Sequence, residues 1–429
     1  MNSSACTSYY RATAAPYAAY EPLQGRVHAR VAIIGGGFAG LNTALGLAER
    51  GVQDVVLLER EQIGFGASGR NGGFVFAGYS LGEQALLDRL GEQTAAKLFA
   101  LTTAAVDRIR RRITDYAIGC NVVDDGVIWA NWFRDPAVLR ERQQRLAERY
   151  GVHWQWLPEE ELRQRVCSER YHDGLFEPDA LHLHPLNYAI GLAAAAAGHG
   201  VRIHEESGVS SLAREGLQWC LRTAQGELLA DQVVLACGGY LAGLQQTIDR
   251  AILPIATYVM VTKPLGDRLD ECLRTRAAIY DSRFAFDYYR ALTDTRLLWG
   301  GRISVFNRSP AAVKRLLTKD LLRVFPQLSG VGIDYAWSGL MSYARHQMPQ
   351  IGGDGNGLWW AQGFGGHGLA PTCAAGELLA AALAEGDDGW KQFADFGLDN
   401  TWRPVGYLAA QASYWWQQSR DCLKSRLEG

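Results

Sequence analysis

Three glycines near the start of the chain have the spacing of a dinucleotide-binding turn. Gly35, Gly37 and Gly40 form a Gly-x-Gly-x-x-Gly motif directly after the apolar run 31–34. The first glycine permits a tight turn, the second lets a pyrophosphate approach the backbone, and the third lets the next helix pack on the strand. Glu59 ends the following apolar run, 19 residues after Gly40, where a carboxylate accepts hydrogen bonds from ribose hydroxyls. The motif predicts a bound dinucleotide, and the acidic Glu59 disfavours NADP.

A second glycine-dense stretch follows at 64–73. It supplies small residues and backbone donors where an extended cofactor would continue, with polar side chains among the glycines. Its candidate cofactor-binding residues are Ala67, Ser68, Arg70, Asn71, Gly72 and Gly73. We expect this stretch to contact the cofactor rather than to form a flexible loop, and from these residues both NAD and FAD remain open.

A third glycine-rich loop precedes a helix that Pro371 opens. Its candidate residues are Gly363, Gly365, Gly366, His367 and Gly368. The loop also fits Gly-x-Gly-x-x-Gly, but only about 60 residues follow it, too few for a second nucleotide-binding domain. A helix N-terminus carries partial positive charge, so we expect this loop to bind the same cofactor, where a reduced flavin gathers negative charge.

Composition and charge exclude several classes of protein. Lys and Arg total 43 and Asp and Glu total 45, a net charge of −2, which is far from the basic surface that nucleic acid requires. No apolar run reaches the roughly 18 residues that cross a bilayer, and the absence of a cationic, apolar leader predicts a cytoplasmic protein. The eight scattered cysteines are expected to be reduced. Asp179, His182 and His184 lie close in sequence without a fourth ligand, so no metal site is expected.

The pattern of elements predicts an α/β fold. Residues 28–60 read as strand, glycine turn, helix and strand, a βαβ unit with parallel strands. Further strands are expected at 231–236, 257–262, 284–290, 297–302 and 358–362, and helices in 85–165 and from Pro185 through the alanine run. Because no linker or repeat separates these elements, we expect a nucleotide-binding body that is interrupted by a second layer.

The three glycine-rich segments together resemble those of the D-amino-acid-oxidase-type family of FAD-dependent amine oxidoreductases. The similarity covers nearly the whole chain, and the nearest branch is that of the γ-glutamylputrescine oxidoreductases, with bacterial L-pipecolate oxidases similar as well. Other segments that carry it are Ser8-Tyr9-Tyr10, His184-Pro185-Leu186-Asn187, Asp287-Tyr288-Tyr289-Arg290 and Phe325-Pro326-Gln327-Leu328.

The resemblance implies a Rossmann-like, glutathione-reductase-like FAD-binding domain with an interleaved α+β substrate domain over the flavin. It implies an N-terminal arm at 1–27, FAD-binding segments at 28–84, 170–250 and 330–400, substrate-domain segments at 85–169 and 251–329, and a C-terminal helix at 401–429.

The resemblance also assigns cofactor contacts. Phe38 and Ala39 would line the pyrophosphate, Glu59 and Arg60 the adenosine, and the Val209 backbone the adenine. The segments 68–73 and 365–370, the latter including Leu369, would surround the flavin.

At two positions this sequence has other residues than family members with covalent flavin or with an oxygen-activating lysine. Members that attach flavin covalently use a cysteine near Ser342, so non-covalent FAD is expected here. Sarcosine oxidases have an oxygen-activating lysine near Leu298, and the segment 297–301 has none. Oxygen, a quinone or another carrier therefore remains open as the electron acceptor.

Oxidation of an amine by flavin needs a neutral amine held close to the flavin, so we expect aromatic walls around the substrate. The candidate catalytic residues are Tyr258, Tyr289, Arg345 and His346. The opposite face of the strand expected at 284–290 offers Phe284, Phe286 and Tyr288 instead of Tyr289. Arg345 either clamps a substrate carboxylate or forms a structural ion pair.

The expected activity is oxidation of the C–N bond of a small amine or amino acid to an imine that hydrolyses, with H2O2 as the co-product. A γ-glutamylputrescine-like amine is the first candidate substrate, and L-pipecolate or another secondary or cyclic amino acid is the alternative. Two further alternatives are a flavin-binding regulatory protein and an NAD-dependent dehydrogenase.

The C-terminal segment 407–427 is expected to form a helix with Tyr414, Trp415 and Trp416. It either docks its aromatic face on the body or makes a weak contact with a membrane surface. Asp421 and Glu428 offset its basic residues, which favours docking.

Overall fold

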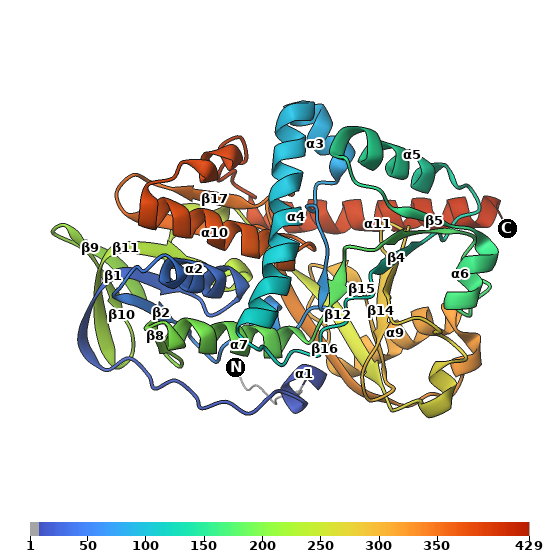
Figure 1. Cartoon of the computed structure of the whole chain (residues 1–429), viewed down its shortest axis with the longest axis horizontal. Helices are drawn as coiled ribbons and strands as arrows, with labels where there is room; N and C mark the ends of the chain where they lie inside the picture. The colour runs from blue at the N-terminus through green and yellow to red at the C-terminus, as the bar shows by residue number, and fades with distance from the viewer. Residues whose placement is uncertain (1–7, 429) are drawn as a thin grey trace.

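Two eight-stranded sheets lie side by side in the computed structural model, which describes residues 8–428 (Figure 1). The first sheet has the order β17–β18–β11–β1–β2–β8, and a β9–β10 hairpin extends β11. Its strands are β1 (Gly25–Ile34), β2 (Val55–Leu58), β8 (Arg202–His204), β9 (Ser211–Glu215), β10 (Gln218–Arg222), β11 (Gly226–Leu235), β17 (Gln350–Gly353) and β18 (Leu358–Gln362).

The centre of the first sheet is parallel and buried on both faces. β1 pairs in parallel with β2 and β11, so Ile33 lies between Leu57 and Val234. Val31 and Ile33 face one apolar cluster, and Ala32 and Ile34 face another. A strand covered on both sides needs apolar residues at every position, which explains the unbroken apolar run. The predicted βαβ unit is therefore present.

Four helices cover one face of this sheet (Figure 1). They are α2 (Phe38–Glu49), α4 (Glu92–Asp115), α7 (Pro185–Gly198) and α10 (Leu369–Glu385). The helices α2 and α10 approach so closely that a Cβ at Gly376 would lie 2.5 Å from the Asn42 Cβ, and one at Gly46 would lie 2.9 Å from the Ala380 Cβ. Glycine at these positions brings two helix backbones into contact.

The second sheet is mixed and has the order β16–β12–β15–β14–β13–β4–β6–β5. Its strands are β4 (Val127–Ala130), β5 (Gln155–Leu157), β6 (Gly174–Glu177), β12 (Leu253–Thr262), β13 (Ala278–Asp281), β14 (Asp287–Ala291), β15 (Leu297–Ser304) and β16 (Ile333–Tyr343). Helix α9 (Pro310–Val324) packs on one face over a buried apolar cluster, and the other face is turned toward the first half of the molecule. The strand that the sequence predicts over 284–290 begins only at Asp287.

The remaining elements are short, apart from the last helix. They are α1 (Tyr9–Ala12), β3 (Phe74–Val75), α3 (Glu83–Leu90), α5 (Ala137–Arg145), α6 (Glu159–Arg165), β7 (Leu181–His182), α8 (Gln246–Arg250) and α11 (Arg403–Leu427). Tyr9 and Tyr10 are buried, so the described part of the N-terminal arm packs on the body as expected. The seven described cysteines are free, and Cys6 lies outside the described residues.

Strand pairing and helix packing group three elements differently from the expected segments. β6 lies within 170–250 and β16 within 330–400, yet both pair in the second sheet. The helix α4, inside 85–169, packs on α10 of the first half. The sequence does not reveal these pairings, because several of the partners, such as β12 for β16 and α10 for α4, are distant along the chain. The division into a flavin-binding and a substrate domain stays a proposal.

Helix α11 lies across both halves. Arg403 pairs with Asp249 near one end, and Ser425 accepts a hydrogen bond from Arg170 near the other. Gln411 and Tyr414 are buried, whereas Trp415 and Trp416 are 56% and 67% exposed. The helix therefore docks through part of its aromatic face.

The acidic residues of α11 mainly contact the body. Asp421 accepts a hydrogen bond from the Phe284 backbone, and Glu428 accepts one from the Arg134 backbone. No helix of residues 8–428 is both long and apolar enough to span a bilayer. Contact of the exposed tryptophans with a membrane surface stays a prediction.

The close contact of α2 and α10 yields the first prediction. In Gly376→Ala, the new methyl group overlaps Asn42, and we expect the free energy of unfolding to fall by roughly 1–3 kcal/mol, as for other overpacked cores. Gly198→Ala is the control, because a Cβ there meets nothing within 4 Å, and it should be neutral or slightly stabilising. Urea unfolding of both variants measures this, and equal stabilities would contradict the tight contact.

Candidate active site

One large cavity of about 1500 Å³ lies between the two halves of the molecule. It begins at the carboxyl ends of the parallel strands, beside Ile34, Leu58 and Ala361, and extends along the second sheet. Open α/β sheets bind ligands at this edge. The volume exceeds the roughly 300–1,000 Å³ of a typical small-molecule pocket, which suits an extended cofactor together with a substrate.

The first glycine motif forms the turn between β1 and α2. Gly35 has φ of +115°, and a Cβ there would lie 2.7 Å from the Ala236 carbonyl oxygen. A Cβ at Gly40 would overlap the Gly35 carbonyl oxygen. Gly37 lines the cavity at the start of α2, where the Phe38 N–H donates to Ser68 Oγ at 2.9 Å. The turn thus presents a helix N-terminus to the cavity, as phosphate binding requires.

Glu59 lines the cavity together with Arg60 and Val209, at the end where the resemblance predicts the adenosine. Its two carboxylate oxygens accept hydrogen bonds from the Gly36 and Glu61 backbone, at 2.7 and 2.9 Å. Burial raises the pKa of Glu59, although these backbone donors oppose the shift. The carboxylate is fixed in orientation beside the glycine turn.

The second and third glycine segments also line the cavity. Ala67, Ser68, Arg70, Asn71 and Gly72 line the cavity, as do Gly365, Gly366, His367, Gly368 and Leu369. Ser80 holds the third segment, since its Oγ accepts a hydrogen bond from the Gly366 N–H at 3.0 Å. Helix α10 begins here without a side-chain cap. A second helix N-terminus therefore faces the same cavity.

Three predicted cofactor residues support this wall without lining it. Gly40 lets α2 pack on the turn. Gly73 donates to the Asn71 side chain and leaves no room for a Cβ beside the Leu183 carbonyl. Gly363 has φ of +75° and donates to Ser342 Oγ. These glycines hold the loops in shape.

Glycine backbone lies close against its neighbours at two places in the cavity wall. A Cβ at Gly72 would lie 2.6 Å from the Tyr288 ring, and one at Gly365 would overlap Ser80 Oγ. Backbone atoms therefore form much of the cradle, with two helix N-termini at its edges. Residues of this kind fit a dinucleotide with a flavin ring.

Beyond this cradle the cavity has an aromatic wall. Its members are Phe74, Phe76, Trp129, Tyr280, Phe286 and Tyr288. The Tyr280 ring stacks between Phe76 and Trp129, with centroids 5.8 and 6.0 Å away. His367 meets the Phe76 ring edge to face at 4.9 Å.

A buried ion pair closes the aromatic end. Arg142 Nη2 of α5 lies 2.6 Å from Glu83 Oε1 of α3, and both residues line the cavity. Burial lowers the pKa of His367 to about 4, and the nearby Arg142 adds to this shift. His367 is therefore a neutral imidazole near pH 7.

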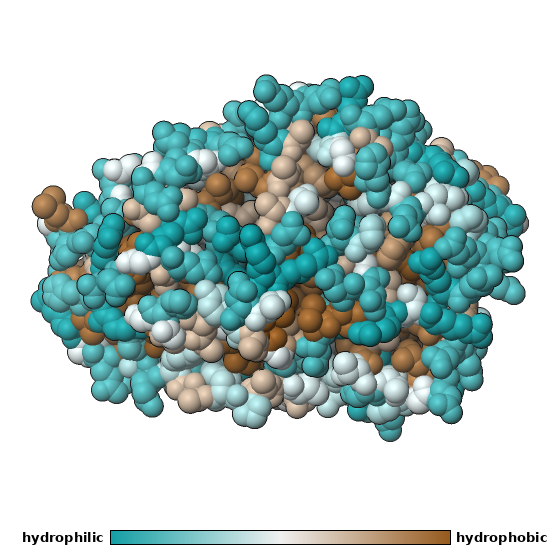
Figure 2. Space-filling view, in the orientation of Figure 1, coloured by the Kyte–Doolittle hydropathy of each residue, from teal (hydrophilic) through white to brown (hydrophobic). Residues whose placement is uncertain are grey.

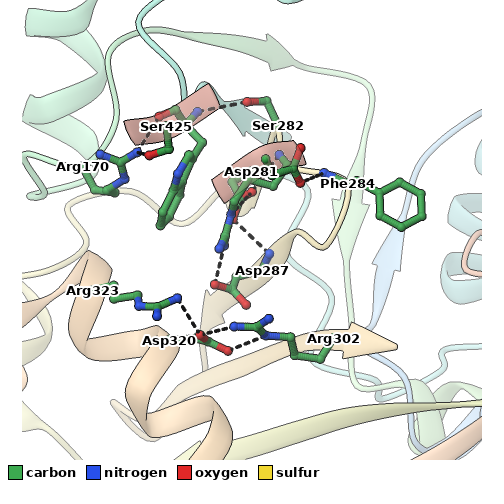
Figure 3. Close-up of polar contacts among 12 residues, drawn as sticks. Arg170, Asp281, Ser282, Phe284, Asp287, Arg302, Asp320, Arg323 and Ser425 are labelled. Atoms are coloured by element: carbon green, nitrogen blue, oxygen red, sulfur yellow. Dashed lines mark hydrogen bonds and ion pairs between the residues drawn. The ribbon is translucent and has the colours of Figure 1, made fainter. Parts of the chain in front are cut away.

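A second group of charges holds the loop 282–286 at the mouth of the cavity (Figure 3). Arg283 lies 2.6 Å from Asp281 and 2.5 Å from Asp287. Arg302 makes two hydrogen bonds to Asp320 beneath them, at 2.8 and 2.6 Å. Burial raises the pKa of Asp287 against the effect of Arg283. We assign this network a structural role, because most of its hydrogen bonds run within the group.

Three of the four predicted catalytic residues lie outside the cavity. Tyr289 stacks on Trp299 at 4.5 Å within the second core, and the Tyr258 hydroxyl donates to the Phe306 carbonyl. His346 accepts a hydrogen bond from the Met348 N–H. Neighbouring residues of a strand point to opposite faces, so Tyr288, the alternative beside Tyr289, faces the cavity instead.

Arg345 is the predicted catalytic residue that does line the cavity. It is exposed, and the ion pairs found in residues 8–428 do not include it. No motif in the sequence indicates Glu83 or Arg142, and most of the aromatic wall was not predicted either. The alternation of Phe74, Val75 and Phe76 directly after the glycine stretch was a usable signal for the wall.

Most residues on the face shown in Figure 2 are hydrophilic, with hydrophobic groups showing between them. Some charged residues of the cavity, such as Glu83 and Asp281, are buried instead. Burial of Glu177, behind Arg142, raises the pKa of its carboxyl to about 8. This carboxyl is protonated in the folded protein over a range where the unfolded chain ionises.

The raised pKa of Glu177 predicts a pH-dependent stability. Its contribution is full below the unfolded pKa of about 4.5 and is lost as the pH rises to about 8. We therefore expect Glu177→Gln to gain stability relative to the parent between pH 5.5 and 8.5, by a few degrees in Tm. Melting curves across this range test it, with the exposed Glu160→Gln as the control. A difference that does not change with pH would contradict the shift.

Comparison with known proteins agrees with this geometry. Residues 30–382 match the family described as DAO, FAD dependent oxidoreductase. The chain is 36% identical to γ-glutamylputrescine oxidoreductase of Escherichia coli over 392 residues, 91% of each chain. It is 34% identical to a probable oxidoreductase, OrdL, of Haemophilus influenzae over 86% of each chain.

The fold is also similar to that of solved structures. Glycine oxidase from Geobacillus kaustophilus superposes with a TM-score of 0.72 at 23% identity, covering 87% of this chain and 99% of that one. The Rossmann-like fold, FAD as cofactor and oxidation of an amine or amino acid follow from the family match. The chain belongs to the DAO family of FAD-dependent oxidoreductases.

Proposed function

We propose that this enzyme oxidises the terminal amine of a small γ-glutamylputrescine-like substrate. The observation that carries this proposal is the aromatic chamber beyond the glycine cradle, which Phe76, Tyr280 and Trp129 wall and Glu83 and Arg142 close. The identity to γ-glutamylputrescine oxidoreductase over 91% of both chains supports it. An elongated amine fits such a chamber better than a compact amino acid.

We propose these residues as the cofactor's contacts. The turn at Gly37–Phe38 and Ala39 would bind the pyrophosphate, Glu59 and Arg60 the adenosine end, and the loops of the second and third glycine segments the flavin. Cys237 is the cysteine that lines the cavity in the part of the chain described, and it lies beside Ile34 at the adenosine end. Ser342 has no thiol to form a bond, so we propose that FAD is held non-covalently.

Bound FAD supplies a two-electron acceptor that takes a hydride from the carbon next to the amine nitrogen. The protein's part is to hold that amine neutral and in place. The nitrogen lone pair forms the C=N bond as the C–H bond breaks, and water hydrolyses the imine to an aldehyde and ammonia. His367 is neutral and lies at the aromatic wall, where its ring can hydrogen-bond a neutral amine. With a pKa of about 4 it is too weak a base to take the proton of an ammonium group, which loses that proton to water instead. We propose dioxygen as the final acceptor, which gives H2O2.

A second candidate function rests on Arg345. This exposed arginine lines the cavity without an ion-pair partner among the described residues, so it could bind the carboxylate of L-pipecolate or another cyclic or secondary amino acid. Its exposure at the mouth makes this alternative weaker, since water screens its charge.

An anaerobic titration of the purified holoenzyme separates the two. We expect γ-glutamylputrescine to bleach the flavin band near about 450 nm and L-pipecolate to leave it unchanged. Admitting air should then restore the band and release H2O2. The Arg345→Met variant should raise the KM strongly only for an amino acid substrate. Bleaching by L-pipecolate alone, with that dependence on Arg345, would overturn the proposed substrate.

A further inference from the structure

Glu83 and Arg142 form an ion pair at the end of the aromatic chamber. Glu83 is the first residue of α3 and is only 9% exposed. It follows Ser80, which holds the third glycine loop, by three residues. The pair therefore lines the same cavity as that loop.

The hydrogen bonding of this pair is incomplete. Arg142 donates from Nη2 to Glu83, but its buried Nε has no hydrogen-bond partner in residues 8–428. A buried donor without a partner is unfavourable by roughly 1–3 kcal/mol. This nitrogen is itself enclosed, and Arg142 lines the cavity with other atoms of the residue.

Another buried pair in the protein shows the contrast. Arg112 donates to Glu49, Glu377 and Asn42 through its guanidinium, and it does not line the cavity. That guanidinium links α4 to α2 and α10, and its nitrogen donors form hydrogen bonds in doing so. Arg142 differs in lining the cavity and in leaving its Nε without a partner among the described residues.

Aromatic side chains surround the pair. The Arg142 guanidinium lies over Trp129 at 4.4 Å and over Trp154 at 4.9 Å, measured to the ring centroids. Trp129 in turn stacks on Tyr280. Such walls exclude water, so a charged ligand group placed here interacts strongly with both partners.

The signs of the two charges define the ligand. Burial alone would raise the pKa of Glu83, but Arg142 holds it below its usual value, so the carboxylate is ionised. Glu177 behind the pair is largely protonated near pH 7. The chamber end therefore offers one anion and one cation side by side. A group with one ammonium and one carboxylate complements it.

We propose that Glu83 and Arg142 bind a zwitterionic α-amino acid group at the end of the substrate remote from the oxidised amine. This inference rests on the proposed function and specifies its substrate class: an amine joined by an apolar spacer to an amino acid head.

The amine that binds Glu83 is not the one that is oxidised. A neighbouring carboxylate favours the protonated form of an amine, and a protonated amine has no lone pair to form the C=N bond. The reacting amine lies instead beside the neutral His367 and the aromatic wall. A substrate must therefore have two nitrogen functions, one at each end of the spacer.

Binding and reduction experiments on the holoenzyme test this. γ-Glutamyl-n-butylamide has the amino acid head but no terminal amine, so calorimetry measures its binding without turnover. We expect Glu83→Gln and Arg142→Met each to weaken its binding roughly 10- to 100-fold. The same variants should raise the half-saturating concentration of γ-glutamylputrescine for anaerobic flavin reduction equally. The half-saturating concentration of putrescine, which has no amino acid head, should change by no more than about threefold in these variants.

The controls are Glu92→Gln and Arg149→Met, which break an exposed ion pair of 2.8 Å between α4 and the segment after α5. Both controls should bind the amide like the parent, and melting curves confirm that all variants fold. Unchanged amide binding in Glu83→Gln and Arg142→Met, or equal losses for putrescine and γ-glutamylputrescine, would overturn the inference. If amide binding depends on the pair but no amine reduces the flavin, the proposed function is refuted and the binding role of the pair stands.

Discussion

The contact between α2 and α10 is the constraint on which the site depends. Each helix follows a parallel strand of the first sheet, β1 or β18, so both begin at the same edge. Glycines at 46 and 376 let the two backbones approach. Two helix N-termini, each equivalent to about half a positive charge, consequently face one cavity. A diphosphate and an electron-rich reduced ring both gain from that field.

The second sheet supplies what the first cannot, namely a wall that excludes water. Its strands alternate, with Tyr258 and Tyr289 in the core under α9 and Thr257 and Tyr288 toward the cavity. Helix α11 lies across both halves and seals the cavity with Gln411 and other residues of its inner face. Several charges of this space are paired, such as Arg142 with Glu83 and Arg283 with Asp281, because an unpaired buried charge is strongly unfavourable.

Sequence reasoning succeeded where local spacing determines structure. The three glycine segments, the βαβ unit and Glu59 depend on neighbours within about 20 residues, and the structure places nearly all of them around the cavity. It failed where contacts between distant segments determine the structure. Which of Tyr288 and Tyr289 faces inward depends on pairing with β15, and β12 has an irregularity between Thr257 and Tyr258. Arg142 forms its ion pair with Glu83, 59 residues away in the sequence, and no sequence motif indicates that pair.

The central claim is that one cavity between the two sheets holds both FAD and an elongated amine. A crystal structure of the holoenzyme with γ-glutamyl-n-butylamide tests it most directly. The account predicts the flavin ring between the 365–369 loop and Tyr288, and the amino acid head against Glu83 and Arg142. A flavin ring placed elsewhere, or the head bound at Arg345 by the mouth, would contradict it.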